Sequence, residues 1–281
     1  MFCRLRWYPD IFLESALGNI FYAPFAFLLH NRVLLGKTVY YDIKARFSGS
    51  ALGLFWLLIH PLLFLGVYAA VYLVIFKVRF QLFNTNEYVV VIFCGLVPFL
   101  GFAEALGVGV GSVTSNAALI KNTMYPITLI PAKAVLVTQS TQGVGIMLVL
   151  VAVSLTGHLT LWALLLPLVW LLQILFMIGL IWILSSLNVY LRDLQYLVAS
   201  ITLMLMMVSP IAYTVDMVPQ GLMPFLWANP LSHMIISYQD ILMMGRFPGN
   251  HFYVFAAISL SFFYAGYGFF QRMHSLFIDN I

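Results

Sequence analysis

Three sets of residues in this sequence have types and spacings that could carry chemistry: the tripeptide Gly36-Lys37-Thr38, the six histidines and the acidic residue Glu104. The tripeptide has the form in which nucleotide-binding P-loops end, where backbone amides and the lysine bind phosphate groups. Such a loop also needs a glycine five residues before the first glycine of the tripeptide, and this chain has Asn31 at that position. The sequence therefore predicts no ATP site on this chain.

The histidines and cysteines form no pattern typical of a metal site or a disulfide framework. The histidines lack a ligand spacing such as HExxH, and the sequence contains no DxD pair to hold a metal-bound nucleotide sugar. Cys3 and Cys94 lie far apart in the sequence, so they form no CxxC site. We therefore expect no catalytic, metal or cofactor-binding residues and no enzyme, with a membrane-bound glycosyltransferase as the weaker alternative. The six histidines are His30, His60, His158, His233, His251 and His274.

Glu104 is the one acidic residue well inside a long apolar segment. A charge at the centre of a bilayer costs roughly 2.5–3.5 kcal/mol on insertion scales, so Glu104 should face protein or a wet cavity, or be protonated. The alternative is a packing contact within a dimer. An ion-coupled secondary transporter usually places several ionisable groups near the midplane, and here only Glu104 and His60 are available. That class remains an alternative function.

The composition determines what kind of elements must position these residues. The chain has 281 residues, of which 63% are hydrophobic and 8% are charged, against roughly 45–50% and about 25% in soluble domains. The apolar runs have the length of helical spans rather than of the short alternating strands of a barrel. We therefore expect an all-α integral membrane protein that forms one domain over residues 1–281. Six spans are predicted at about 52–76, 88–113, 127–155, 161–187, 194–214 and 251–271.

The basic residues predict the orientation of these spans. Pro9, Asp10 and Glu14 interrupt the N-terminal segment where a signal peptide would need an apolar core, so we expect a cytoplasmic N-terminus. With that orientation, all but three of the 13 lysines and arginines lie on the cytoplasmic side, as the positive-inside rule requires. An even number of spans places the C-terminus in the cytoplasm too. The excess of basic charge needs no nucleic-acid partner to explain it.

Residues 1–50 should form a cytoplasmic segment that contains a helix lying in the membrane interface. Apolar residues and a glycine recur there at spacings of three and four, while Lys37, Lys44 and Arg46 lie off this stripe. A basic amphipathic helix of this kind lies in the headgroup layer, where its cations meet lipid phosphates. The stripe consists of Leu29, Val33, Gly36, Tyr40, Ile43 and Phe47.

The first span carries an aromatic residue or histidine at every fourth position, which forms a slowly winding ridge. Aromatic faces can carry sugar rings without binding one sugar tightly, and tyrosine adds a polar tip. Our hypothesis is that part of this ridge lines a translocation path. The alternative is a set of lipid-facing aromatic residues and interfacial belts. The ridge consists of Trp56, His60, Phe64, Tyr68, Tyr72 and Phe76.

The loop between the second and third spans should carry a short helix, capped by Ser115 or Asn116 and ending near Asn122. Pro126 can open the next span. Apolar residues of this loop would face the cytoplasm without lipid to cover them, which suggests docking into a groove of a partner. Insertion into the interface as ordinary loop anchors is the alternative. The apolar residues are Leu119, Ile120, Met124 and Tyr125.

Residues 215–245, before the last span, are too apolar for a plain external loop. Asn229 can cap a helix, Pro230 suits its first position and Gly245 suits its end. The segment from Pro230 is about a dozen residues long, which is too short for a span. We expect two short helices that dip back into the membrane from the external side, with a single helix lying flat on the membrane as the alternative.

Four segments, in order, resemble the motifs of ABC-2 type exporter permeases, in particular of the polysaccharide branch. "YYDIKARFSGSALGLFW" resembles the family's "RDLKxRYxxSxLGxxW" at the first span, and "LIKNTMYP" resembles its coupling segment "LIKKxxFP". Asn122 stands where the family has a second basic residue. "LNVYLRDL" resembles the family's "LNVxxRDI" loop, and "SPIAYTVDMVP" with "NPLSHMI" resembles its external region.

The resemblance implies a permease subunit that forms a homodimer in the bacterial cytoplasmic (inner) membrane and exports a lipid-linked polysaccharide, with O-antigen as the first guess. Capsule, teichoic acid, drug or lipid export are the alternatives within the family. ATP and Mg would bind a separate ATPase subunit. The resemblance implies that this subunit contacts Leu119, Ile120, Lys121, Asn122, Met124, Tyr125 and Pro126. An external gate would include Asn229, Pro230, His233 and Tyr238.

Overall fold

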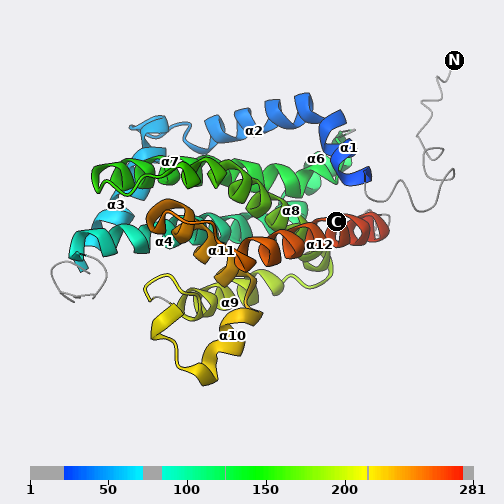
Figure 1. The fold of residues 1–281 in the computed structure, drawn as a ribbon. Coiled ribbons are helices and arrows are strands. Elements are labelled where there is room, and N and C mark those ends of the chain that lie inside the picture. The colour runs from blue at the N-terminus through cyan, green and yellow to red at the C-terminus, as the bar shows by residue number, and fades with distance from the viewer. Residues whose placement is uncertain (1–21, 72–83, 124, 214, 275–281) are drawn as a thin grey trace, which may run out of the picture.

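The computed structural model describes residues 22–71, 84–123, 125–213 and 215–274. These residues form helices joined by turns and contain no strand, which confirms the all-α prediction for the described part of the chain. Four long helices build the bundle (Figure 1): α4 (Thr85–Gly109), α7 (Leu129–Leu155), α8 (Leu166–Tyr190) and α12 (Asn250–Met273). The shorter helices are α1 (Ala23–His30), α2 (Arg32–Arg46), α3 (Trp56–Ala70), α5 (Ser112–Ser115), α6 (Ala117–Asn122), α9 (Leu194–Val208), α10 (Met223–Ala228) and α11 (Pro230–Gln239).

Five helical segments in the described ranges are long and apolar enough to cross a membrane, which indicates a multi-pass membrane protein. They are Gly53–Ala70, Asn86–Gly109, Leu129–Leu155, Leu161–Tyr190 and Asn250–Met273. Each corresponds to one of the six predicted spans; residues 72–76 of the first prediction lie outside the described residues. The predicted span at 194–214 is longer than the helix found there, since α9 ends at Val208. Its 15 residues extend about 22 Å, less than the roughly 30 Å of a bilayer core.

Local sequence signals explain where several helices begin and end. Asn84 and Glu87 form a capping box at the start of α4, in which the Asn84 backbone amide donates to the Glu87 carboxylate over 2.9 Å. Asn229 caps α11 as predicted, since its side-chain oxygen accepts from the Leu231 amide over 3.0 Å. Gly245 ends the π-helical turn that follows α11, at a φ of 60°, a conformation that favours glycine.

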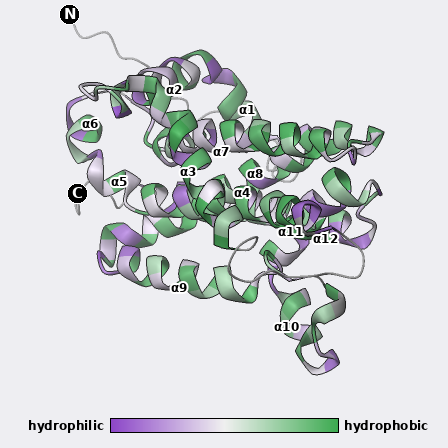
Figure 2. Ribbon diagram, turned by 90° about the vertical axis from the view of Figure 1, so that its left-hand side faces the viewer, coloured by the Kyte–Doolittle hydropathy of each residue, from purple (hydrophilic) through white to green (hydrophobic). Residues whose placement is uncertain are grey.

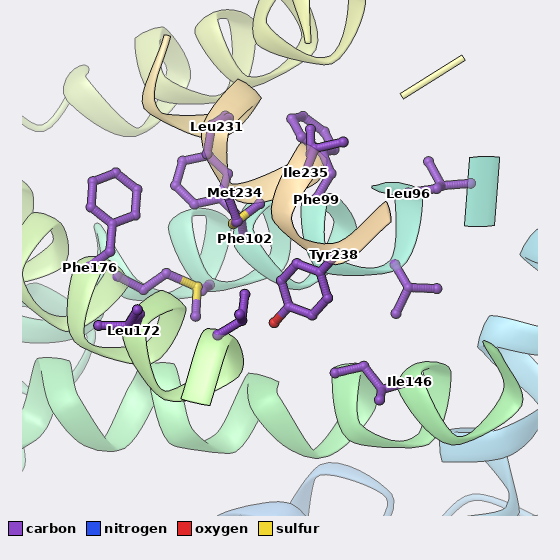
Figure 3. Close-up of a cluster of buried hydrophobic side chains, with 14 of the residues drawn as sticks. Leu96, Phe99, Phe102, Ile146, Leu172, Phe176, Leu231, Met234, Ile235 and Tyr238 are labelled. Carbon is purple, nitrogen blue, oxygen red and sulfur yellow. The ribbon is translucent and has the colours of Figure 1, made fainter. Parts of the chain in front are cut away.

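Helix α11 lies inside the bundle, where it packs against α4, α8 and α12. Every residue from Leu231 to Gln239 is buried. Figure 3 shows Leu231, Met234 and Ile235 of α11 beside Phe99 and Phe102 of α4, in the cluster that also contains Tyr238 and Phe176. This short helix is therefore part of the core, whereas α10 lies on the surface and exposes Phe225 and Trp227.

The bundle also depends on a close crossing of α8 and α12 at Gly179 and Gly266. A β-carbon added at either glycine would overlap the backbone of the other helix. The two backbones can therefore approach as closely as they do only without side chains, as in other close crossings of membrane helices.

Helices α2, α3 and α9 lie at the edges of the bundle. In both views α2 lies beyond α7, whereas α9 and α10 lie on the opposite side of the molecule (Figures 1 and 2). In the first span 11% of the most apolar window is buried, against 78% in the second. Along α9, Val198 is the buried residue, and apolar side chains such as Leu203 and Met207 are exposed. These edges can be covered by lipid or by another protein.

Candidate functional site

A cavity of about 450 Å³ lies between α3, α4 and α7, beside the end of α2. Trp56, His60 and Phe64 line it from α3. Glu104 of α4 and Gln142 of α7 form parts of the other walls, and Arg46 closes one side. The structure thus brings three residues of the predicted aromatic ridge together with Glu104, although 40 residues or more separate them in sequence.

The rest of the ridge lies differently. Tyr68 stacks on Phe64, with ring centroids 5.0 Å apart and planes inclined by 25°, and so extends the aromatic surface beyond the cavity. Tyr72 and Phe76 lie outside the described residues. The described part of the ridge therefore offers three neighbouring rings and an imidazole on one side of α3, which is a surface on which sugar rings can stack.

Glu104 forms an ion pair with Arg46, whose guanidinium nitrogen lies 2.5 Å from the carboxylate oxygen. The Glu104 side chain is 23% exposed and the Arg46 side chain 38% exposed. The pair offsets the charge that made Glu104 costly within an apolar helix. We expected Arg46 at lipid headgroups, but the structure places its guanidinium against Glu104. The sequence pattern of α2 alone does not reveal this carboxylate on α4.

Two further polar contacts connect α2 to α7 and to the residues that precede it. The Lys133 ammonium, mostly buried, lies 2.7 Å from the Asp42 carboxylate, and the Thr38 and Tyr125 hydroxyls are 3.2 Å apart. Thr38, Asp42 and Arg46 follow each other at intervals of four residues, so they share one face of α2.

The opposite face of α2 carries Val33 and Tyr40, which are 63% and 61% exposed. The helix is therefore amphipathic with its polar face against the protein. Ile43 and Phe47 of the predicted stripe are half-buried, and Phe47 lines the cavity, so only part of the stripe is open to lipid. Lys37 and Lys44 are exposed, and their contact with lipid phosphates stays a prediction. Leu29 belongs to α1, which the turn at Asn31 separates from α2.

The predicted coupling segment forms α6, which ends at Asn122 as expected. Lys121 and Asn122 are exposed, whereas Leu119 and Ile120 are half-buried and Ile120 packs against the core. The structure thus differs from the expectation that Leu119 and Ile120 stand free in the cytoplasm, because this short helix rests partly on the protein itself. Met124 lies outside the described residues.

The residues that follow α6 turn back toward α2. Tyr125 is half-buried, and its hydroxyl lies beside that of Thr38. Pro126 precedes the helix rather than opening it: α7 begins at Leu129, whose amide donates to the Pro126 carbonyl over 2.9 Å. The coupling segment is therefore connected directly to α2, and through Arg46 to the cavity.

The four residues of the predicted external gate do not share one surface. Asn229 donates to the Ser209 hydroxyl over 3.0 Å, and Pro230 opens α11. The His233 Nδ1 atom lies 3.0 Å from Nδ1 of His251, and its other ring nitrogen lies 3.0 Å from the Trp227 carbonyl. Tyr238 is fully buried in the bundle, where its hydroxyl donates to Gln173 over 2.7 Å.

Sequence reasoning missed several buried polar residues of α7 and α8, of which Gln142 lines the cavity. Gln142 and Gln173 bond to each other, and Gln139 accepts from the Trp170 ring nitrogen over 2.7 Å. Lys133, the partner of Asp42, was also missed as a functional residue. The available signal was a glutamine or lysine inside an otherwise apolar run, because polar side chains within a membrane helix usually face a protein partner.

Residues 37–243 match the family described as ABC-2 type transporter. Two similar curated proteins carry the name O-antigen export system permease protein RfbA. One, from Klebsiella pneumoniae, is 30% identical over 211 residues, which cover 73% of this chain and 78% of that protein. The other, from Myxococcus xanthus, is 27% identical over 260 residues, which cover 90% of this chain and 97% of that protein.

Proposed function

Because the chain belongs to the ABC-2 type transporter family, it is a transporter membrane subunit, and we propose that it exports O-antigen as a lipid-linked polysaccharide. The observation that carries this proposal is the aromatic cavity in a chain whose relatives are named O-antigen export permeases. The transporter acts in the bacterial cytoplasmic (inner) membrane, with both termini of the subunit in the cytoplasm. Capsule, teichoic acid and drug or lipid export remain the alternatives within the family.

A separate ATPase subunit supplies the energy and binds ATP and Mg. It contacts α6 and the residues up to Pro126. The hydroxyl contact between Tyr125 and Thr38 and the ion pair between Arg46 and Glu104 support a mechanical route, because both involve α2. A movement of the coupling segment would thus shift α2 along α7 and change the shape of the cavity.

The functional permease is a homodimer. The apolar and exposed faces of α3 and α9 support this proposal, since two such faces on one chain are available to a second copy. A dimer formed around α3 would bring two aromatic ridges together, and sugar rings could pass between them by changing from one ring face to the next. The segment with α10 and α11 would form the external gate of this path.

The test is a deletion of the gene in its host, followed by fractionation of the envelope. We expect lipid-linked polysaccharide to accumulate on the inner side of the cytoplasmic membrane and the surface polymer to disappear. Restoring the gene should reverse both effects, whereas a copy with Trp56 and Phe64 replaced by leucine should restore little export. A normal surface coat in the deletion strain, without a second exporter, would refute the function.

A further inference from the structure

A hydrogen-bonded network of side chains crosses the bundle from the cavity to α11. The Gln142 amide nitrogen of α7 donates to the Gln173 oxygen of α8 over 2.8 Å, and the Gln173 nitrogen donates back over 3.1 Å. Tyr238 of α11 donates to the same Gln173 oxygen over 2.7 Å. The Gln173 nitrogen also donates to the Pro98 carbonyl of α4 over 2.9 Å. Four helices thus meet at one glutamine.

All three side chains of this network are buried: Gln142 is 3% exposed, and Gln173 and Tyr238 are fully buried. A buried amide without partners costs free energy, which gives each of these groups a preference for staying bonded. The Gln173 oxygen uses both of its acceptor positions, for Gln142 and Tyr238. If Gln142 turned away, Tyr238 would keep its bond to Gln173 while Gln173 lost two of its contacts.

Gln142 is also among the residues that line the cavity, so one end of the network borders it. Gly101 of α4 provides the space for its amide, because a β-carbon added there would overlap the Gln142 side chain. A displacement of the amide toward the cavity would exchange a contact with Gln173 for one with a molecule there. An amide can donate to and accept from a sugar hydroxyl, which matches both of its polar atoms.

We propose that Gln142 binds a hydroxyl group of the exported sugar at the cavity wall, and that Gln173 and Tyr238 transmit this contact to α11. The proposal rests on the proposed function and adds a residue that senses the substrate and a route to the helix at the centre of the bundle. Gln142 is the binding residue, and Gln173 and Tyr238 are positioning residues.

The chain supplies a matched control in Gln139, three residues before Gln142 on α7. It is also buried and also bonds a side chain of α8, the ring nitrogen of Trp170. Gln139 is not among the residues that line the cavity in the described part of the chain, and its other hydrogen bond reaches Met177 of α8 rather than α11. Replacing Gln139 by leucine thus removes an amide from the same helix pair without touching the proposed route.

The experiment uses the permease with its ATPase subunit in vesicles of bacterial polar lipid. The probe is the glycolipid extracted from the strain that lacks this gene. ATP hydrolysis and backbone hydrogen exchange in α11 are measured with and without the probe, for the wild type and for Gln142→Leu, Gln173→Leu, Tyr238→Phe and Gln139→Leu. Tyr238→Phe removes only a hydroxyl and keeps the ring, so it gives a folded variant of the network if a leucine variant does not accumulate.

In the wild type and in Gln139→Leu, we expect the glycolipid to change exchange in α11 by about 2- to 10-fold, the range that corresponds to one hydrogen bond. Gln142→Leu should abolish this change and raise the half-saturating glycolipid concentration by a similar factor. Tyr238→Phe and Gln173→Leu should abolish the change in α11, with a smaller effect on half-saturation.

The contrary outcomes separate this inference from the proposed function. Glycolipid that stimulates ATP hydrolysis in the wild type without changing exchange in α11 would overturn the inference and leave the function intact. An equal response of Gln142→Leu and Gln139→Leu would do the same. Glycolipid that changes neither ATP hydrolysis nor exchange would contradict both.

Discussion

The core around α11 and the edge helices α3 and α9 use apolar residues in opposite ways. In the core, apolar side chains pack on one another and on buried glutamines, and in the second span 78% of the most apolar window is buried. At the edge, α3 is mostly exposed: in the first span, 11% of the most apolar window is buried. Since lipid tails are as apolar as leucine, hydrophobicity alone does not bring membrane helices together.

This difference indicates that small and polar residues determine which helix faces pack against each other. Gly179 and Gly266 let α8 and α12 touch, and the glutamines of α7 and α8 bond across their interface. The described part of α9 between Leu194 and Val208 contains neither glycine nor glutamine beyond its first turn. Four predictions test this contrast, beginning with the change expected to have the largest effect.

Substitution of Gly266 by valine should disrupt the core most severely. The new side chain would overlap the backbone around Gly179, and the helices could accommodate it only by moving apart. We expect a loss of more than about 3 kcal/mol of stability, because overpacking against a backbone cannot be relieved by a rotamer change. The measurement is the yield of monodisperse protein in mild detergent. Gly268→Val on the same helix, where a β-carbon meets open space, is the control; equal yields would contradict the prediction.

Removal of the ion pair at the boundary between the two regions should have the next largest effect. Glu104→Gln leaves Arg46 without its partner, and we expect a destabilisation of about 1–3 kcal/mol, since the pair is only partly buried. Export should fall as well, because the pair forms part of the cavity wall.

The test of this charge pair is thermal unfolding, followed by the exchange of the two charges. The double variant Arg46→Glu with Glu104→Arg should recover part of the loss. Lys44→Gln, an exposed cation on the same helix, should change little. No recovery in the exchanged variant would argue against a direct pair.

Substitution of an exposed edge residue should affect association rather than folding. Leu203 on α9 is 69% exposed, and Leu203→Asn should weaken the proposed dimer by about tenfold while the chain stays folded. The fraction of cross-linked dimer in native membranes measures this effect. Leu171 on α8 is 50% exposed and serves as the control site; equal effects of Leu203→Asn and Leu171→Asn would place the dimer contact elsewhere.

The smallest effect is expected from the hydroxyl contact that connects the coupling segment to α2. Tyr125→Phe removes one partly buried hydrogen bond to Thr38, for which we expect a loss of about 0.6 kcal/mol, the average of such bonds in bacteriorhodopsin. Thr38→Val also removes the bonds that this hydroxyl donates to the Leu34 and Leu35 carbonyls, so its loss should be at least as large, and the double variant should lose no more than Thr38→Val alone. Additive losses in denaturant titrations would mean that the two hydroxyls act independently.

The local features of this protein were predictable from the sequence. The apolar runs predicted the positions of the five described segments that are long enough to cross a membrane, and Asn229 and Gly245 predicted both ends of the segment that contains α11. The ridge on α3 was visible as a repeat of four. These features depend on neighbouring residues and on the thickness of a bilayer, so the amino-acid sequence alone is enough to predict them.

Only the tertiary structure decided which faces meet. Arg46 pairs with Glu104 rather than with lipid, Leu119 and Ile120 are half-buried, and α11 lies inside the core. Gln142 became a cavity residue because α3, α4 and α7 converge beside it. Such contacts join residues far apart in sequence, and in a membrane all the candidate faces are similarly apolar. The sequence by itself therefore determined the helices, and the close fit of glycines, amides and charges determined their arrangement.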